Sequence, residues 1–206
     1  EKDDKMNKKL DYVATNMTML FWANEMITGA KLKQQKIPDK EIRRLAQEEN
    51  IFQARSENFR KKAASGIISR LNTLDEFTID LLCSCNIETA KQITIYSILK
   101  SDLLFFAFVN EIYREKIILK DYKITDVDIN IFINRKLEQV PKIASWKETT
   151  IRRLKNNYIS YLSETGFVKK QKDYLEIIKP IIDKKFAEHL IEIGDQIYLE
   201  AMTAYI

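Results

Sequence analysis

The chain has 206 residues, of which 45% are hydrophobic and 31% charged, and it contains only four glycines and three prolines. This composition excludes a disordered or collagen-like chain and predicts a helix-rich globule, built as one medium domain or as two small domains packed together. Its formal net charge is +4, so a surface that attracts a polyanion has to arise from basic residues concentrated in particular segments.

The sequence shows no pattern typical of a membrane or secreted protein. The first ten residues, EKDDKMNKKL, mix acids and bases and differ from a secretory signal. The longest uncharged apolar run is residues 103–109, LLFFAFV, whereas a membrane span needs about 20 apolar residues. We therefore expect a cytoplasmic protein that has no membrane partner.

Apolar residues recur at intervals of three and four along nearly the whole chain, while strict alternation is scarce. This period predicts an all-α, compact multi-helix bundle that contains helix-turn-helix-like elements and has room for one small β-hairpin wing. The predicted helices cover residues 16–34, 39–49, 52–72, 75–84, 88–118, 126–139, 147–165 and 181–203.

Capping and turn residues support several of these boundaries. Pro38 suits the first turn of a helix, and Thr125 is placed as an N-cap with Asp126 and Asp128 near the positive helix end. Gly166 stands where a left-handed residue often ends a helix. Two more prolines separate neighbouring helices, Pro141 and Pro180.

A charged connection at residues 111–126 follows a long apolar helix and is the best candidate for a boundary. It predicts an N-terminal helical subdomain at residues 1–118 and a C-terminal subdomain at residues 119–206 that resembles a helix-turn-helix or winged helix. The two subdomains are expected to pack together and can share one core.

Residues that usually carry catalysis or bind metals are few and scattered. Cys83 and Cys85 have no second pair to complete a zinc site, and we interpret them as small core residues. The sole histidine, His189, has no accompanying nucleophile motif, and we interpret it as structural. Helix capping explains Asp126 and Asp128 better than a metal site does. We expect no enzyme activity, no metal and no cofactor.

The segment at residues 145–168 carries the clearest functional pattern. At about 100° per residue, its apolar side chains gather on one side of a helix: Ile151, Leu154, Tyr158, Tyr161 and Leu162. The opposite side receives polar and basic residues: Thr149, Arg152, Arg153, Asn156 and Ser160, with Asn157 at its margin. Residues 147–170 hold six bases and two acids, so this short stretch alone has a net charge of +4.

Such a face suits nucleic acid, because guanidinium groups bind phosphates or guanine, and Asn and Thr reach bases or phosphate oxygens. A helix at residues 126–139 precedes it, which gives helix-turn-helix order. Two short β-compatible pieces at residues 167–168 and 174–177 flank a turn with three lysines, Lys169, Lys170 and Lys172, and predict a basic wing. The residues predicted to contact DNA are Lys147, Thr149, Arg152, Arg153, Asn156, Asn157, Lys169 and Lys170. An ordinary exposed basic helix is the alternative.

Residues 52–72 form a second basic segment. Five bases outnumber one acid, Glu57, and give a further net charge of +4: Arg55, Arg60, Lys61, Lys62 and Arg70. A predicted accessible face contains Arg55, Asn58, Lys62, Ser65 and Ser69. Apolar residues lie on two sides of this helix, so a central packing helix is at least as good an interpretation. We rank Arg55, Lys61 and Lys62 second as DNA contacts.

Four features spread over most of the chain resemble the BrxA family of BREX bacteriophage-exclusion systems. They are the apolar N-terminal helix, NIFQARSENFRKKAASGIISRL, SILKSDLLFFAFVNEIYREKI and WKETTIRRLKNNYISYLSETGFV. The resemblance implies a cytoplasmic, mainly helical, non-enzymatic component that binds double-stranded DNA beside other BREX proteins. It offers no catalytic residue to transfer. The alternatives are a protein-interaction scaffold whose basic surfaces meet acidic patches of a partner, and an RNA-binding helical bundle.

Overall fold

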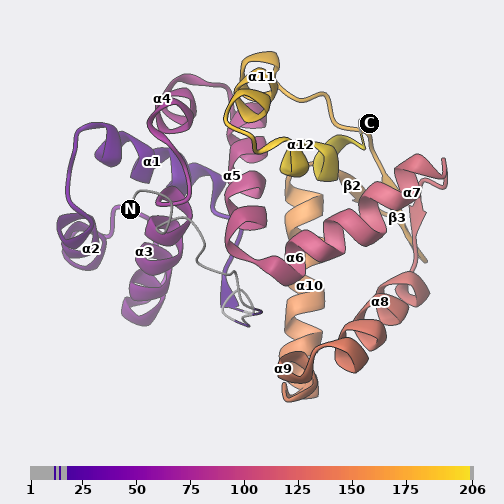
Figure 1. Ribbon diagram of the computed structural model, residues 1–206. Coiled ribbons are helices and arrows are strands. Elements are labelled where there is room, and N and C mark those ends of the chain that lie inside the picture. Colours follow the sequence, from indigo (N-terminus) through magenta and orange to yellow (C-terminus); the bar gives the residue numbers. More distant parts are fainter. Residues whose placement is uncertain (1–11, 13, 15–17, 205–206) are drawn as a thin grey trace, which may run out of the picture.

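The computed structural model describes residues 12, 14 and 18–204, and its fold is mainly α-helical, as predicted. Helices fill the N-terminal half, shown at the left of Figure 1: α1 (Ala23–Gln34), α2 (Asp39–Glu48), α3 (Glu57–Leu71), α4 (Glu76–Ser84) and α5 (Ile87–Ser101). Helix α5 stands in the middle of the molecule, and nearly all its side chains between Thr89 and Leu99 are buried. The buried apolar residues of both halves form one core cluster.

The predicted single helix at residues 88–118 is wrong. After α5 the chain bends by 110° and continues as three short helical pieces, α6 (Leu103–Phe108), the π-helical turn η2 (Val109–Arg114) and α7 (Glu115–Ile118). The break lies at Asp102, whose extended backbone has φ −132° and ψ 99°. Its fully buried carboxylate accepts a hydrogen bond from the Phe105 N–H at 2.9 Å, so it caps α6 and starts a new helix direction.

Two other predicted helices begin later than expected. Helix α1 starts at Ala23 because Trp22 has a left-handed backbone, with φ 62°; residues 16–17 of that prediction lie outside the described residues. Helix α3 starts at Glu57, where the Ser56 hydroxyl caps the Phe59 N–H. The predicted helices at residues 39–49, 75–84, 126–139 and 147–165 agree with the structure to within one residue.

The C-terminal half combines helices with a small sheet. Its elements are β1 (Lys123–Ile124), α8 (Asp126–Gln139), α9 (Pro141–Ala144), α10 (Glu148–Glu164), β2 (Val168–Lys170), β3 (Leu175–Ile177), α11 (Lys184–Glu192) and α12 (Gln196–Thr203). Thr125 and Asp128 form a capping box at the start of α8, which confirms the predicted cap. The predicted last helix at residues 181–203 is wrong as one helix, since Gly194, with φ +80°, separates α11 from α12.

The predicted wing is present as the antiparallel hairpin β2–β3, and β1 adds an unforeseen third strand in the order β1-β3-β2. In the register of the hairpin Val168 pairs with Ile177 and Lys169 pairs with Glu176. Neighbouring side chains of a strand point to opposite faces, so Lys169 and Lys170 lie on different faces of the hairpin.

The division into subdomains at residues 1–118 and 119–206 stays a prediction. The last two helices return to the N-terminal half, where the Gln92 amide donates to the Ile181 carbonyl at 2.9 Å. His189 Nε2 lies 2.6 Å from Asp75 Oδ2 and ties α11 to α4. These contacts fix the halves against each other.

Within the described residues, no single helix is both long and apolar enough to cross a membrane. Only α5 taken together with the α6–α7 stretch meets that requirement in length and composition, and the 110° bend separates the two parts.

Candidate nucleic-acid interface

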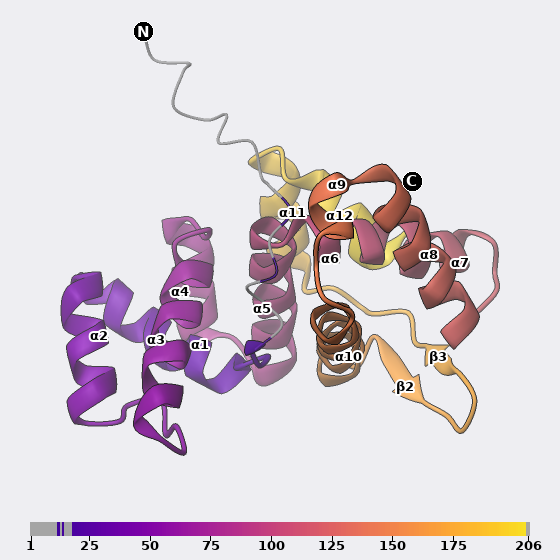
Figure 2. The ribbon, with the colours of Figure 1, turned by 90° about the horizontal axis from the view of Figure 1, so that it is seen from below.

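Helix α10 runs along the surface between the hairpin and the N-terminal helices. Figure 2 looks along its axis, with β2–β3 on one side and α1–α5 on the other. Its inner side confirms the predicted buried face, because Leu154, Tyr158 and two further residues, Tyr161 and Leu162, are buried. Ile151 is half-buried and packs against the same core.

Two tyrosine hydroxyls fix the rotation of α10 about its own axis. The Tyr158 hydroxyl donates to the buried carboxylate of Asp102, with O···O distances of 3.1 and 3.2 Å. Burial, reinforced by Asp102, raises the pKa of Tyr158 well above its ordinary value, so the hydroxyl keeps its proton. The Tyr161 hydroxyl donates to the Met19 carbonyl at 2.8 Å, and burial raises the pKa of Tyr161 to about 12. The helix is therefore held with one defined side outward.

The outward side carries the predicted polar and basic residues. All of its members are exposed: Thr149, Arg152, Arg153, Asn156 and Ser160. Among the described residues, neither Arg152 nor Arg153 forms an ion pair. Lys147, directly before α10, is also exposed. These cations are available to an external anion.

Asn157 and Lys155 lie at the two edges of this outward side. Asn157 is half-buried, and its amide donates to the Met19 carbonyl at 3.2 Å, so the side chain already has an intramolecular role. Lys155 donates to Asn130 Oδ1 at 2.5 Å and faces α8. The exposed arc of α10 ends at these two residues.

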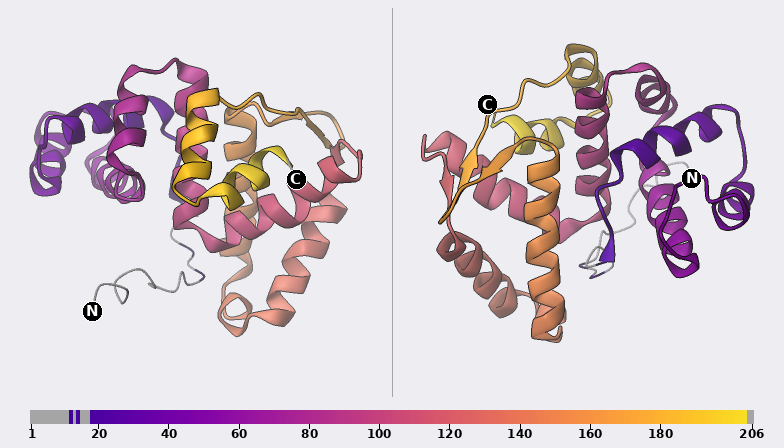
Figure 3. Two further views of the ribbon diagram at one scale, coloured as in Figure 1. Left: turned by 45° about the horizontal axis from the view of Figure 1, so that its top comes forward. Right: turned by 180° about the vertical axis from the view of Figure 1, so that it is seen from behind.

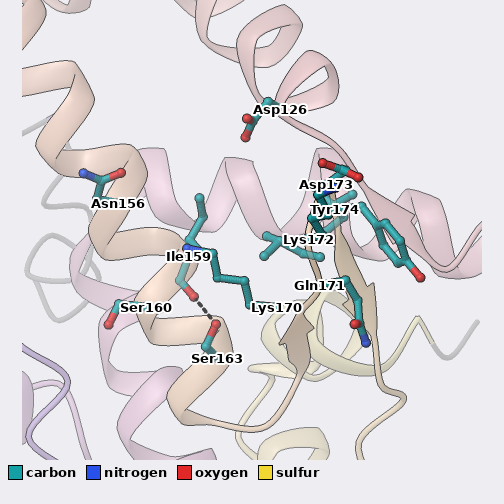
Figure 4. Close-up of a pocket in the computed structure, with 12 residues that line it drawn as sticks. Asp126, Asn156, Ile159, Ser160, Ser163, Lys170, Gln171, Lys172, Asp173 and Tyr174 are labelled. Atoms are coloured by element: carbon teal, nitrogen blue, oxygen red, sulfur yellow. Dashed lines mark hydrogen bonds between the residues drawn. The ribbon is translucent and has the colours of Figure 1, made fainter.

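A cleft of about 820 Å³ separates α10 from the hairpin (Figure 4). Asn156 lines it from α10, and Lys170 and Lys172 line it from the hairpin. Lys169 is exposed on the other face beside Glu176, so the structure joins only one of the two predicted wing lysines to Asn156. The predicted contacts do not include Lys172, although its position in the basic turn of the wing is the sequence signal for it.

Acids also line this cleft, namely Asp126 and Asp173. Ser160 and Ser163, which belong to α10, line the cleft as well. The Ser163 hydroxyl donates back to the Ile159 carbonyl at 2.8 Å. The lining thus offers both donors and acceptors, with the positive charge on the hairpin side.

The second basic segment is divided between surface and interior. Arg55, Lys61 and Lys62 are exposed, and Lys61 lies 3.1 Å from Glu57. The predicted accessible face is confirmed, because its other members are exposed as well: Asn58, Ser65 and Ser69.

Two arginines of this segment have inward roles. Arg60 Nη1 donates to the Gln47 carbonyl at 2.8 Å. Arg70 is 2% exposed, and its Nη1 donates to the carbonyls of Leu20 and Phe21 at 2.8 and 2.7 Å. Burial lowers the pKa of Arg70 from its ordinary value. Both guanidinium groups therefore have partners within the protein.

The remaining candidate residues fit structural roles. Cys83 and Cys85 are half-buried, and burial raises the pKa of both thiols. His189 stacks on Phe77, with ring centroids 4.1 Å apart, in addition to its contact with Asp75. In the described part of the chain, no group of three or more His, Cys, Asp or Glu side chains is arranged to hold a metal ion.

Comparison with known proteins identifies the family. The family model described as BrxA matches residues 11–194. The chain belongs to the BrxA family. The BREX protein BrxA of Bacillus cereus (strain H3081.97) is 40% identical over 163 residues, which cover 79% of this chain and 82% of that protein. The resemblance noted in the sequence is thereby confirmed, and the chain is a BrxA-family component of a BREX phage-defence system.

Two more distant comparisons agree with membership of the BrxA family. The BREX protein BrxA of Escherichia coli O9:H4 (strain HS) is 28% identical over 119 residues, covering 58% of this chain and 56% of that protein. The crystal structure of an uncharacterized protein from Magnetospirillum magneticum has a TM-score of 0.83, with 94% of this chain and 99% of that chain covered. At 18% identity, the latter likeness shows the fold alone.

Proposed function

We propose that this BrxA-family protein is a non-enzymatic component that binds double-stranded DNA through α10 and the β2–β3 hairpin. The observation that carries the proposal is the outward side of α10, where Arg152 and Arg153 are exposed and form no ion pair among the described residues. Lys170 and Lys172 face the same helix across the cleft. DNA affinity depends mainly on such phosphate-neutralising cations.

The order of elements supports a groove-binding helix. Helix α8, the short α9 and the exposed α10 follow one another in helix-turn-helix order, and the hairpin follows α10 as a wing would. A helix with its side chains is about 10–12 Å across, which matches a major groove about 12 Å wide. In this arrangement Thr149 and Asn156 face base edges, while the arginines and wing lysines contact phosphates.

The same geometry favours duplex DNA over duplex RNA. The major groove of A-form RNA is deep and too narrow for side chains to read, so an exposed helix has no matching groove there. Competition between a DNA duplex and an RNA duplex of the same sequence tests this choice. We expect DNA to displace RNA, and preferential retention of RNA would favour the helical RNA-binding alternative.

The Arg152→Ala/Arg153→Ala variant tests the site itself. If about six phosphates are neutralised, the log–log dependence of affinity on salt has a slope of about −5, and loss of two contacts reduces its magnitude by about 2. Fluorescence anisotropy with a labelled duplex at several salt concentrations measures the slope. The melting temperature should stay close to that of the wild type, because both arginines are exposed.

Lys155→Ala is the matched control on the same helix, since Lys155 faces α8 and contacts Asn130. Its salt slope should equal that of the wild type. Wild-type protein that binds no duplex even at low salt would refute DNA binding and favour the protein-interaction scaffold. Binding that persists unchanged in the double variant would refute this face of α10.

A further inference from the structure

Four residues near the N-terminus, Met19 to Trp22, lie between the two basic helices; we call residues 19–22 the strap. In Figure 1 and in the right panel of Figure 3 this indigo segment runs between α3 and α10. From the α10 side, Tyr161 and Asn157 both donate to the Met19 carbonyl, at 2.8 and 3.2 Å. The strap is therefore fastened directly to the proposed DNA-binding helix.

Helix α3 holds the strap from the other side. The Arg70 guanidinium donates to the carbonyls of residues 20 and 21 and lies over the Trp22 ring, 5.3 Å from its centroid. A Cβ atom at Gly66 would come within 2.7 Å of Trp22 Cζ3 and 2.8 Å of Met19 Sδ, so glycine permits this close approach. Phe59 meets the Trp22 ring edge-on, with centroids 6.4 Å apart.

On α3, the strap-facing side borders an exposed stripe. Lys62 is eight residues before Arg70, which places it about 80° around the helix, next to the strap and outside the core. The rest of the stripe is exposed too: Asn58, Ser65 and Ser69. On the opposite border of the strap-facing side lie the buried Ile67 and Leu71.

On α10, the strap-facing residues also border the exposed face. Arg153 lies about 40° around the helix from Asn157, on the solvent side, whereas Leu154 and Tyr158 lie toward the core. The Leu20 side chain on the strap is 50% exposed and lines a pocket together with Lys91 of α5 and Glu164 of α10. Glu164, which accepts a hydrogen bond from the Ser160 hydroxyl at 2.9 Å, marks the C-terminal limit of this basic surface.

We propose that the exposed stripes of α3 and α10 form one surface, joined across the strap, that contacts a single DNA duplex. This inference rests on the proposed function of α10 and adds α3 as a second contact with the same ligand. Only the single chain of the strap separates the two stripes. A duplex carries a negative charge about every 1.7 Å of its axis, so one duplex that lies across the strap presents phosphates to both stripes. Lys62 is the contact that α3 contributes closest to the strap, and Lys61 takes no part.

Two charge reversals on neighbouring residues test the joint surface. Lys61 lies on the side of α3 opposite Arg70 and is paired with Glu57, so Lys61→Glu and Lys62→Glu change the net charge equally at different faces. The Lys62→Glu change replaces a close attraction between a lysine and a phosphate by a repulsion. It should therefore weaken duplex binding roughly 10- to 30-fold. Lys61→Glu should alter the dissociation constant by less than about threefold, because its effect is screened through solvent.

The outcomes separate this inference from the proposed function. Equal affinities of the two lysine variants, together with a reduced salt slope for Arg152→Ala/Arg153→Ala, would overturn the joint surface and leave α10 as the DNA site. A titration at protein concentrations far above the dissociation constant should saturate at one duplex per chain. Saturation at two duplexes per chain would show that α3 and α10 bind separate ligands, which also overturns the inference.

Discussion

The two basic helices have similar charge in the sequence and different charge at the surface. The segments at residues 52–72 and 147–170 each sum to +4. On α10 both arginines face outward, whereas on α3 the half-buried Arg60 and the buried Arg70 donate to backbone carbonyls. The net charge of a segment therefore overestimates the positive charge that is available to a ligand.

The difference follows from how much of the circumference of each helix is covered. Helix α10 buries one continuous arc, so the rest of its circumference stays free for polar residues. Helix α3 is buried over a wider arc, which runs from Ala63 on the strap side to Leu71, Ala64 and Ile68 on the core side. A base on such a helix has few free directions, and a guanidinium that turns inward must find acceptors.

Replacing Arg70 by Met tests this difference between the two helices with the largest expected effect. The change removes a buried cation that donates to two carbonyls, and Met cannot donate to either, so unfolding should require about 3–5 kcal/mol less free energy. Urea denaturation followed by circular dichroism measures the loss. Arg153→Met is the matched control and should change stability by about 0.5 kcal/mol or less. Equal stability of the two variants would mean that burial of Arg70 does not secure the strap.

Leu154→Ala tests the covered arc of α10. Leu154 is 1% exposed, so its truncation leaves a cavity under the helix and should cost about 2–5 kcal/mol of unfolding free energy. Thr149→Ala, on the outward side of the same helix, should cost little. A wild-type melting temperature for Leu154→Ala would show that the two sides of α10 have been assigned wrongly.

The smallest expected effect concerns Asp39, which ties α2 to the end of α3. Hydrogen bonds from Asn72, at 2.9 Å, and from Lys33 lower the pKa of Asp39 below its ordinary value. A carboxylate with a lowered folded-state pKa stabilises the fold above its unfolded-state pKa, and this contribution is lost as pH falls through the folded-state pKa. After allowance for solvent screening, Asp39→Asn should cost about 0.5 kcal/mol at pH 7.

The stability difference between wild type and Asp39→Asn should shrink in acid, and urea titrations at about pH 7 and pH 3 measure it. A difference that stays constant or grows toward acid would contradict the lowered pKa. For Arg70→Met, the same two titrations should show no comparable decrease in the stability difference from the wild type, because the arginine keeps its proton between pH 3 and pH 7.

Much of this molecule follows from local patterns in its sequence. The 3.6-residue period predicts the helical class, and capping residues such as Thr125 and Asp128 set boundaries correctly because capping is a contact between near neighbours. The sidedness of α10 could also be predicted, since a helix that buries one arc repeats its apolar residues every three to four positions. The hairpin after Gly166 follows from another local pattern, two short β-compatible pieces on either side of a polar turn.

The tertiary structure alone decided the rest. In the sequence Asp102 stands directly before the apolar run at residues 103–109, and only its burial against Tyr158 explains why α5 and α6 meet at a bend. The inward turn of Arg70 depends on carbonyls about 50 residues away, at positions 20 and 21, which no helical period encodes. Composition and periodicity predict whether a residue favours a helix and on which side of that helix it lies. Whether a charge remains at the surface depends on partners that are distant in sequence. Burying an unpaired polar group costs free energy, so a charged side chain can turn inward only where such a partner is present.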